Sequence, residues 1–318
     1  LRKMNPLKKM FFYIFWILKN MILKLTPTRR LLLLAGILFL LTANRIVLID
    51  SELKISSNWS LFGGILIILV LMLELKDKLL AKDELSAGRK IQEALMPEES
   101  PYLEGWSVWL YSQPANEVCG DLVDFFQPDE NRTLILMSDV AGKGLNAALL
   151  TTKLQAIIRS LANDYAENQL ISKVNATFYR ESLRKIFATL LFIEVEKDSD
   201  FLKIVNAGHL PPYLVRDKSI IEMKKGHTAL GLLKNAEYKV QIENFKRGDM
   251  IVIFSDGVTE SKNKRGEFFG LERLRMSIIN NQNMSVNNLG NNILNEINDF
   301  SKETRQSDDI SLVIIKRM

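Results

Sequence analysis

Short apolar runs bounded by turn residues predict a β-rich domain after residue 97. The expected strands are 106–112, 122–127, 132–138, 187–195, 201–206, 213–216, 238–243, 250–255 and 310–316. The expected helices are 145–163, 168–183, 270–281 and 285–302. Because the strands follow one another through tight turns and the helices come in pairs, we predict an α+β fold over residues 98–318. Its two antiparallel sheets would pack as a sandwich flanked by helices, an αββα arrangement.

Two long apolar runs precede this domain. Residues 31–49 and 59–75 are each close to the roughly 20 residues that cross a bilayer, which predicts a two-span transmembrane hairpin over residues 31–75. Lys and Arg flank the hairpin on both sides, so we expect both chain ends and the large domain in the cytoplasm, at the inner membrane. A pair of buried core helices is the alternative.

Two further segments border the apolar runs. Residues 1–30 are basic and amphipathic, a pattern that favours an interfacial helix on an anionic leaflet, with a signal-peptide-like role as the alternative. Residues 76–97 combine alternating charges with spaced leucines and predict a helical linker. Both a coiled-coil homodimer and a simple amphipathic spacer fit the linker pattern.

Composition narrows the functional classes. The net charge is +5, and residues 1–30 alone contribute +8 because they hold eight Lys or Arg and no acid. Residues 31–318 therefore carry −3, so we expect no nucleic-acid partner. The single cysteine, Cys119, excludes an intrachain disulfide and an all-cysteine zinc site, and two histidines make a zinc enzyme a poor candidate. Oxygen ligands remain as candidates for binding a metal ion.

Aspartates recur at the ends of expected strands. Asp121 precedes the run 122–127 and Asp139 follows the run 132–138, with a turn between the two runs. If these two runs form an antiparallel hairpin, residues whose numbers add up to about 260 face each other. Asp121 and Asp139 meet this condition, so their Cβ atoms would lie roughly 5 Å apart. Two like charges at this distance need a cation, and hard divalent ions such as Mg²⁺ and Mn²⁺ are the usual partners of clustered carboxylates.

Two more acidic positions match this placement. Asp256 ends the run 250–255, and Asp308 and Asp309 precede the run 310–316. The end of one strand and the start of its antiparallel neighbour lie on the same rim of a sheet. Carboxylates gathered on one rim repel one another unless metal is bound, so the sequence predicts a two-cation site.

Six motifs resemble, in residues and in order, the PPM-type metal-dependent serine/threonine protein phosphatases and, among them, the bacterial SpoIIE/RsbU branch. The motifs are 92–97, 114–121, 138–144, 206–212, 248–260 and 308–312, so the resemblance covers residues 88–318. Where that family commonly has Gly-Gly-Asp-Phe-Tyr-Asp, this chain has Cys119-Gly-Asp-Leu-Val-Asp124.

The resemblance implies two Mn²⁺ or Mg²⁺ ions that activate a water to attack a phosphoryl group. The implied metal ligands are Asp121, Asp139, Asp256, Asp308 and the carbonyl of Val140. Contacts with substrate, or support of the ligands, are predicted for Asp124, Lys143, Gly257 and Asp309.

The sequence thus predicts a membrane-anchored phosphatase. Resemblance implies as substrate a phosphoserine or phosphothreonine on a small regulatory protein, of the anti-sigma-factor antagonist type. The alternative is a catalytically inactive, membrane-tethered binding module of the same fold. His209, in a Gly-His-Leu-Pro-Pro turn, is predicted to hold backbone groups rather than to act as a catalytic acid.

Overall fold

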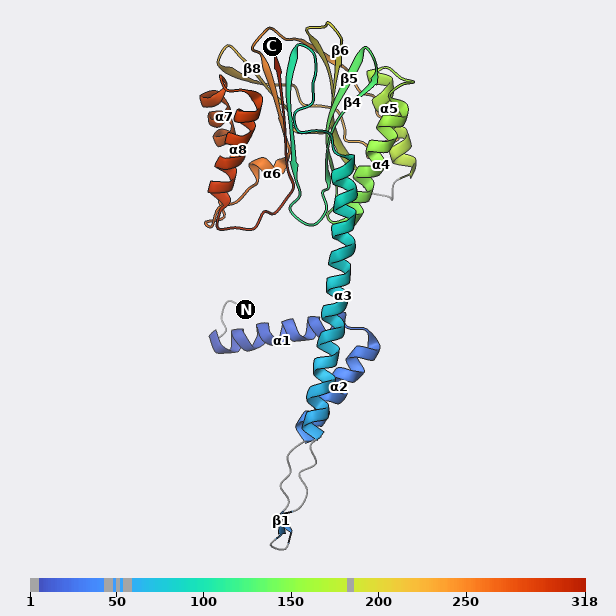
Figure 1. The fold of residues 1–318 in the computed structure, drawn as a ribbon, viewed down its shortest axis with the longest axis vertical. Helices are drawn as coiled ribbons and strands as arrows, with labels where there is room; N and C mark the ends of the chain where they lie inside the picture. The colour runs from blue at the N-terminus through green and yellow to red at the C-terminus, as the bar shows by residue number, and fades with distance from the viewer. Residues whose placement is uncertain (1–5, 43–47, 50–51, 54–58, 182–185) are drawn as a thin grey trace. The chain divides into compact units, whose positions relative to one another are not determined.

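The structure is a computed structural model that describes residues 6–42, 48–49, 52–53, 59–181 and 186–318. The chain divides into two compact units, Leu1–Glu84 and Leu85–Met318 (Figure 1). The first unit contains three helices among its described residues: α1 (Pro6–Lys24), α2 (Pro27–Thr42) and the first part of α3 (Trp59–Leu95). A two-residue ladder joins β1 (Leu48–Ile49) to β2 (Glu52–Leu53).

Helices α2 and α3 contact each other through glycines and through an ion cluster. A Cβ atom at Gly63 would lie 2.6 Å from the carbonyl oxygen of Gly36, so only glycine permits this approach of the two backbones. Near the other end, the guanidinium of Arg29 contacts Glu74 at 2.9 Å and Asp77 at 2.7 Å. The pair is therefore fixed by close backbone packing and by opposite charges.

Among the described residues, no helix combines the length and the apolar character that crossing a membrane requires. Helix α2 has 16 residues, about 24 Å at the rise of an α-helix, against about 30 Å of hydrocarbon. In α3, Glu74 interrupts the apolar run that begins at Trp59. Residues 43–47, in the predicted first span, lie outside the described residues. The predicted two-span hairpin is therefore not supported.

The second unit is built on two antiparallel five-stranded sheets. The first has the order β10-β7-β6-β5-β4, with bounds Gln241–Asn244, Phe201–Ala207, Ala188–Glu196, Arg132–Val140 and Asp121–Asp129. The second has the order β3-β12-β11-β8-β9, with bounds Trp106–Gln113, Ile310–Arg317, Met250–Phe254, Tyr213–Arg216 and Ser219–Glu222. The predicted sandwich of antiparallel sheets is confirmed.

Helices cover both outer faces of the sandwich (Figure 1). Side chains of α4 (Leu145–Leu161) and α5 (Glu167–Glu181) share one buried cluster with the first sheet. Those of α7 (Gly270–Asn281) and α8 (Val286–Ser301) share another with the second sheet, and a third cluster fills the space between the sheets. This three-cluster core follows from strands whose two faces are both apolar.

Most predicted elements lie within two residues of their observed bounds. Helix 270–281 coincides with α7, and the last two residues of predicted helix 168–183 lie outside the described part of the chain. The prediction missed β9 and the short helix α6 (Asp256–Thr259), and it began one strand too early, at 238 rather than Gln241. Tyr238 is instead buried in the cluster beneath α4 and α5, and pairing with β7 starts only at Gln241.

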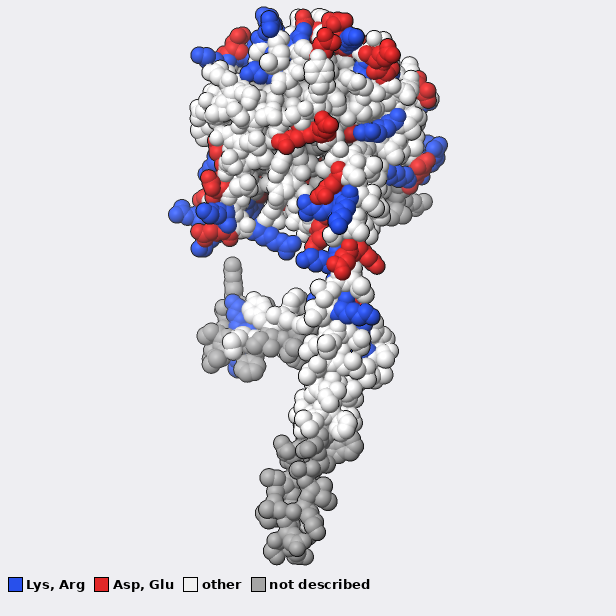
Figure 2. All heavy atoms as spheres, viewed as in Figure 1, with Lys and Arg blue, Asp and Glu red and all other residues white. Residues whose placement is uncertain are grey.

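The visible face of the second unit is largely uncharged. In Figure 2, small groups of Lys or Arg and of Asp or Glu are scattered over this face, and no broad region there carries only one sign. Such interspersed charges create no long-range field of one sign over that face.

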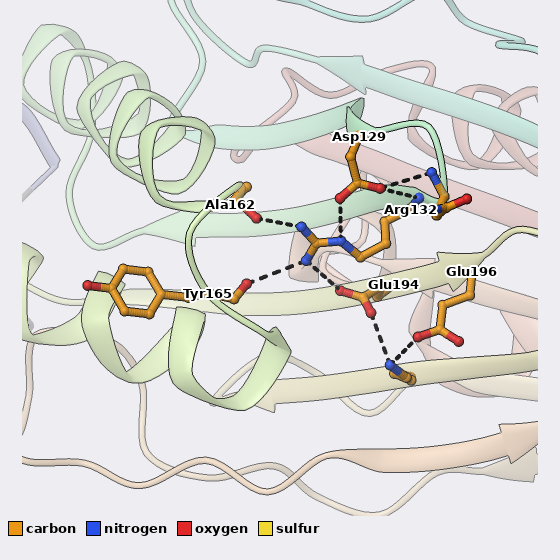
Figure 3. A network of polar contacts seen from close by, with 8 residues as sticks. Asp129, Arg132, Ala162, Tyr165, Glu194 and Glu196 are labelled. Atoms are coloured by element: carbon orange, nitrogen blue, oxygen red, sulfur yellow. Dashed lines mark hydrogen bonds and ion pairs between the residues drawn. The ribbon is translucent and has the colours of Figure 1, made fainter.

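At the turn end of the β4–β5 hairpin, an ion network ties together four strands and the end of α4 (Figure 3). Arg132 contacts Asp129 at 2.7 Å and Glu194 at 3.7 Å, and it donates to the carbonyl of Ala162 at 3.0 Å. Glu194 is only 1% exposed and also pairs with Lys203 at 3.2 Å. A buried carboxylate thus meets cations from two neighbouring strands, which compensates its desolvation.

We expect Arg132→Ala to destabilise the protein by about 3 kcal/mol, because the substitution leaves buried Glu194 with less compensation and frees the Ala162 carbonyl. Urea unfolding followed by tryptophan fluorescence measures this loss. As a matched control, Arg247→Ala removes an exposed arginine and should change the free energy of unfolding by less than about 0.5 kcal/mol. Equal effects of the two substitutions would contradict a stabilising role for the network.

Candidate functional site

Asp121 and Asp139 lie opposite each other at the open end of the β4–β5 hairpin, in the register that the sequence predicts. Asp121 is 5% exposed, and its Oδ2 accepts a 2.6 Å hydrogen bond from the hydroxyl of Ser311, on β12 of the other sheet. Burial raises the pKa of Asp121 well above its ordinary value, and the charges of Asp139 and Asp309 add to this rise. The hydroxyl of Ser311 partly offsets it.

Asp139 connects the hairpin with the other acidic side chains. Burial, followed by the charges of Asp256 and Asp308, raises the pKa of Asp139 to about 6, and Lys143 opposes the rise. The pKa of Asp256 is also raised, by burial first and by the charge of Asp308 second. The structure therefore brings these carboxylates close enough for each to disfavour ionisation of its neighbours.

The adjacent acids of the last motif have different surroundings. Asp308 is partly exposed, and its Oδ2 accepts a hydrogen bond from the Lys143 ammonium group at 2.9 Å. The carboxylate of Asp309 instead accepts from the backbone N–H groups of Ala115, at 2.7 Å, and Gly120, at 2.6 Å. Asp308 thus pairs with a cation, whereas Asp309 fixes the backbone directly before Asp121.

Gly257 and Val140 serve the site through their backbones. A Cβ atom at Gly257 would overlap the carbonyl of Asp309, so glycine allows the start of α6 to pack against the Asp308–Asp309 peptide. The N–H of Val140 donates to the carbonyl of Gly120 at 3.4 Å, which extends the hairpin ladder to the edge of the site. Gly257 thus supports the Asp308–Asp309 peptide, and the metal-ligand role of the Val140 carbonyl stays a prediction.

Asp124 lies away from the other acids. It is fully buried on the face of β4 that α4 covers, and its two oxygens accept hydrogen bonds from Arg159 at 2.9 Å and 2.6 Å. Arg159 also lies over the ring of Phe126, 4.8 Å from the ring centroid. These contacts of Arg159 attach α4 to the sheet, so the structure does not support a substrate contact for Asp124.

Sequence reasoning missed several side chains that support the site. The hydroxyl of Ser255 accepts from the N–H of Ser311 at 2.9 Å and donates to the carbonyl of Asp309 at 3.1 Å. Gln92, near the end of α3, bonds both the N–H and the carbonyl of Cys119 at 3.0 Å. Ser255, Ser311 and Gln92 all lie within the sequence motifs, so membership of a motif was the signal that could have identified them.

His209 has the structural role that its turn predicts. It is buried, burial lowers its pKa to about 4, and its Nδ1 lies 3.1 Å from the hydroxyl of Thr189. Its N–H donates to the side chain of Asn206 at 2.8 Å. The N–H of Asp139 in turn donates to the Thr189 hydroxyl at 3.2 Å, so Thr189 links His209 to Asp139.

Cys119 is not a nucleophile in this setting. Burial, together with the charges of Asp309 and Asp121, raises the pKa of its thiol far above the ordinary value. A thiol that stays protonated is unreactive. Its Sγ lies 3.4 Å from the hydroxyl of Ser112, which in turn lies 3.0 Å from that of Ser311.

The donor set has the chemistry that a hard divalent cation requires. In the described parts of the chain, no three His, Cys, Asp or Glu side chains converge into a ready-made metal cluster. The acids nevertheless raise one another's pKa values, and a bound cation would relieve this repulsion. Mg²⁺ and Mn²⁺ prefer carboxylate and carbonyl oxygens, which Asp121, Asp139, Asp256, Asp308 and Val140 offer. These residues fit such an ion as prospective ligands.

Curated proteins that match this chain include two phosphoserine phosphatases by name. Phosphoserine phosphatase RsbU of Bacillus subtilis is 27% identical over 242 residues, which cover 74% of this chain and 70% of the relative. Protein IcfG of Synechocystis is 26% identical over 263 residues, which cover 74% of this chain but only 41% of that protein. The predicted enzyme class, a hydrolase of the serine/threonine protein phosphatase type, is confirmed.

Solved structures share the fold. The SiaA-PP2C domain of Pseudomonas aeruginosa superposes with a TM-score of 0.66 at 18% identity, covering 76% of this chain and 98% of that domain. RsbX in complex with magnesium has a TM-score of 0.53 at 14% identity, covering 69% of this chain and 98% of RsbX. The RsbX structure contains magnesium, one of the two cations predicted for this chain.

The family model described as Stage II sporulation protein E (SpoIIE) matches residues 129–318, more than half of the chain. This match contains the last four of the six sequence motifs, apart from residues 92–97 and 114–121. The chain therefore belongs to the SpoIIE family, within the PP2C-like fold of serine/threonine protein phosphatases.

Proposed function

We propose that the chain is a metal-dependent phosphatase that removes phosphate from phosphoserine or phosphothreonine of a small regulatory protein. The observation that carries this proposal is the set of mutually repelling carboxylates at one edge of the sandwich, in a chain of the SpoIIE family. The name of RsbU, a phosphoserine phosphatase, supports the substrate class. An anti-sigma-factor antagonist is the expected type of substrate.

Each acidic residue has a distinct task in this proposal. Asp121, fixed by Ser311, and Asp139 would hold the ions from the first sheet, while Asp256 and Asp308 would hold them from the second. Bound Mn²⁺ or Mg²⁺ would supply a Lewis acid that polarises phosphoryl oxygens and lowers the pKa of water. Asp309 keeps the Gly120 peptide in place and thereby positions Asp121.

Lys143 supplies positive charge at the same edge. Its ammonium group is 63% exposed and contacts Asp308 at 2.9 Å. An exposed ion pair of this kind is weak, so its partners can change at little cost. We assign Lys143 to the approach of the anionic substrate and to the orientation of Asp308.

A catalytically inactive binding module of the same fold is the competing function. All four acidic positions are present, which favours the enzyme, because a binding module would gain nothing from keeping repelling carboxylates at a buried edge. Activity measurements distinguish the two.

We expect Asp139→Asn and Asp256→Asn each to lower kcat on order of 100-fold or more, because each removes a charged oxygen donor from the cation site. Hydrolysis of an aryl phosphate and of a phosphoserine peptide by the purified full chain, with Mn²⁺, Mg²⁺ or a chelator, measures this loss. Chelation should abolish turnover of the wild-type chain.

Asp299→Asn is the matched control, since Asp299 is an exposed acid on α8. It should leave turnover unchanged. Absence of turnover with either metal in a folded wild-type chain would favour the binding module, and activity that survives both site substitutions would remove Asp139 and Asp256 from the ligand set.

We also propose that α1 places the chain at the inner surface of an anionic membrane. Supporting this are lysines 8, 9, 19 and 24 on one helix with exposed Phe12, Phe15 and Trp16. The full chain should therefore co-sediment with vesicles containing anionic lipid more than with zwitterionic vesicles. Replacing both Phe15 and Trp16 with Ser should reduce binding several-fold, and unchanged binding would contradict the role of α1.

The charged part of α3 supports a homodimer proposal. Leu79, Leu80 and Ile91 are each more than half exposed on this helix. Such apolar side chains become buried when two helices pair. Sedimentation equilibrium of the full chain should reveal a dimer that weakens on Leu80→Ser and Ile91→Ser substitution, and a monomer at all accessible concentrations would exclude it.

A further inference from the structure

A pocket of about 340 Å³ continues from the acidic edge along the surface of the second unit. Asp139 and Asp256 line it on one side, and its other walls include Leu210, Pro211 and Lys225. Its volume falls at the lower end of the roughly 300–1,000 Å³ that is typical of ligand sites. The pocket therefore offers room beside the acids for more than a phosphoryl group.

One buried side chain fixes the walls of this pocket. Asn206 accepts from the N–H of His209 at 2.8 Å and donates to its carbonyl at 3.1 Å. The backbone carbonyl of Asn206 accepts from the N–H of His227 at 2.8 Å. Gly226 packs so closely on Asn206 that a Cβ there would overlap it. The loop carrying Leu210 and the segment carrying Lys225 are thus held by the same residue.

Lys225 is the cation of this wall. Its side chain is exposed, and among the described residues no acidic group forms an ion pair with it. Lys143, by contrast, is already engaged with Asp308. An unpaired ammonium group beside apolar Leu210 and Pro211 suits a ligand that combines an anionic oxygen with apolar atoms.

We propose that this pocket is the subsite for the phosphorylated segment of the substrate protein, and that Lys225 is a specificity-determining residue that pairs with an anionic oxygen of that segment. The inference rests on the proposed phosphatase function and adds the position at which the substrate protein binds. The segment next to the phosphorylated residue contacts Leu210 and Pro211, which lie on the same pocket as Asp139 and Asp256. The anionic oxygen comes either from the phosphoryl group or from an acidic side chain beside it.

The test compares Lys225→Ala, Lys225→Arg and the neighbouring Lys224→Ala in the full chain. Three substrates separate the sources of the anionic oxygen: an aryl phosphate, a phosphoserine peptide with a flanking Asp, and the same peptide with Asn in that place. Steady-state kinetics gives KM and kcat, and fluorescence anisotropy of labelled peptides gives binding without turnover.

We expect Lys225→Ala to raise KM and the peptide dissociation constant about 5- to 10-fold, with a smaller change in kcat, as for one partly exposed charge-assisted contact. Lys225→Arg should retain most of the affinity and Lys224→Ala all of it. A loss confined to the peptide with Asp identifies the flanking carboxylate, and an equal loss for all three substrates identifies the phosphoryl group.

Unchanged KM and unchanged peptide binding in Lys225→Ala would overturn the proposal, as would an equal effect of Lys224→Ala. Failure of the phosphatase function has a different signature, because the wild-type chain would then turn over none of the three substrates. In that case the anisotropy measurement still decides whether Lys225 binds the phosphorylated peptide.

Discussion

The hydrogen bond from Ser311 to the buried carboxylate of Asp121 joins the two sheets at the edge where the acids meet. Asp121 belongs to the first sheet and Ser311 to the second, so the position of this carboxylate depends on how the sandwich is packed. Asp309 reinforces the junction by accepting the N–H of Gly120 across the same edge. Because an unpartnered buried carboxylate is costly, Asp121 is stabilised at this position only when the two sheets are packed together.

The β4–β5 hairpin shows how one pair of strands serves stability and function at its two ends. At the turn, Asp129 and buried Glu194 meet the cation of Arg132, and opposite charges compensate one another (Figure 3). At the open end, Asp121 and Asp139 face each other and further acids, and like charges raise their pKa values. Compensation at one end and repulsion at the other distinguish a structural ion network from a site suited to cations.

Local sequence patterns were enough to predict the sandwich and the opposition of Asp121 and Asp139. Strand register depends on alternation and on the length of the turn, both of which are local. The different roles of Asp308 and Asp309 came from the family resemblance and not from local pattern, because they depend on which of two adjacent side chains meets the Gly120 peptide. The pairing of Asp124 with Arg159 was not predictable, since Arg159 lies on a helix 35 residues away. The apolar runs before residue 76 suggested membrane spans from their composition, but none of the described helices is long and apolar enough to cross a membrane.

The acids of the site differ in how firmly the fold holds them, and this difference follows from their partners. Buried Asp121 is bound by a hydroxyl donor and half-buried Asp309 by two backbone donors, and such sheltered hydrogen bonds are costly to break. Asp308 contacts the exposed ammonium group of Lys143, where water competes for both partners. The first sheet and its supports therefore define a fixed half of the site, whereas Asp308 and Lys143 form an adjustable half. A site that must admit and release a charged group needs adjustable members at its open side, and the exposed position of Lys143 meets that requirement.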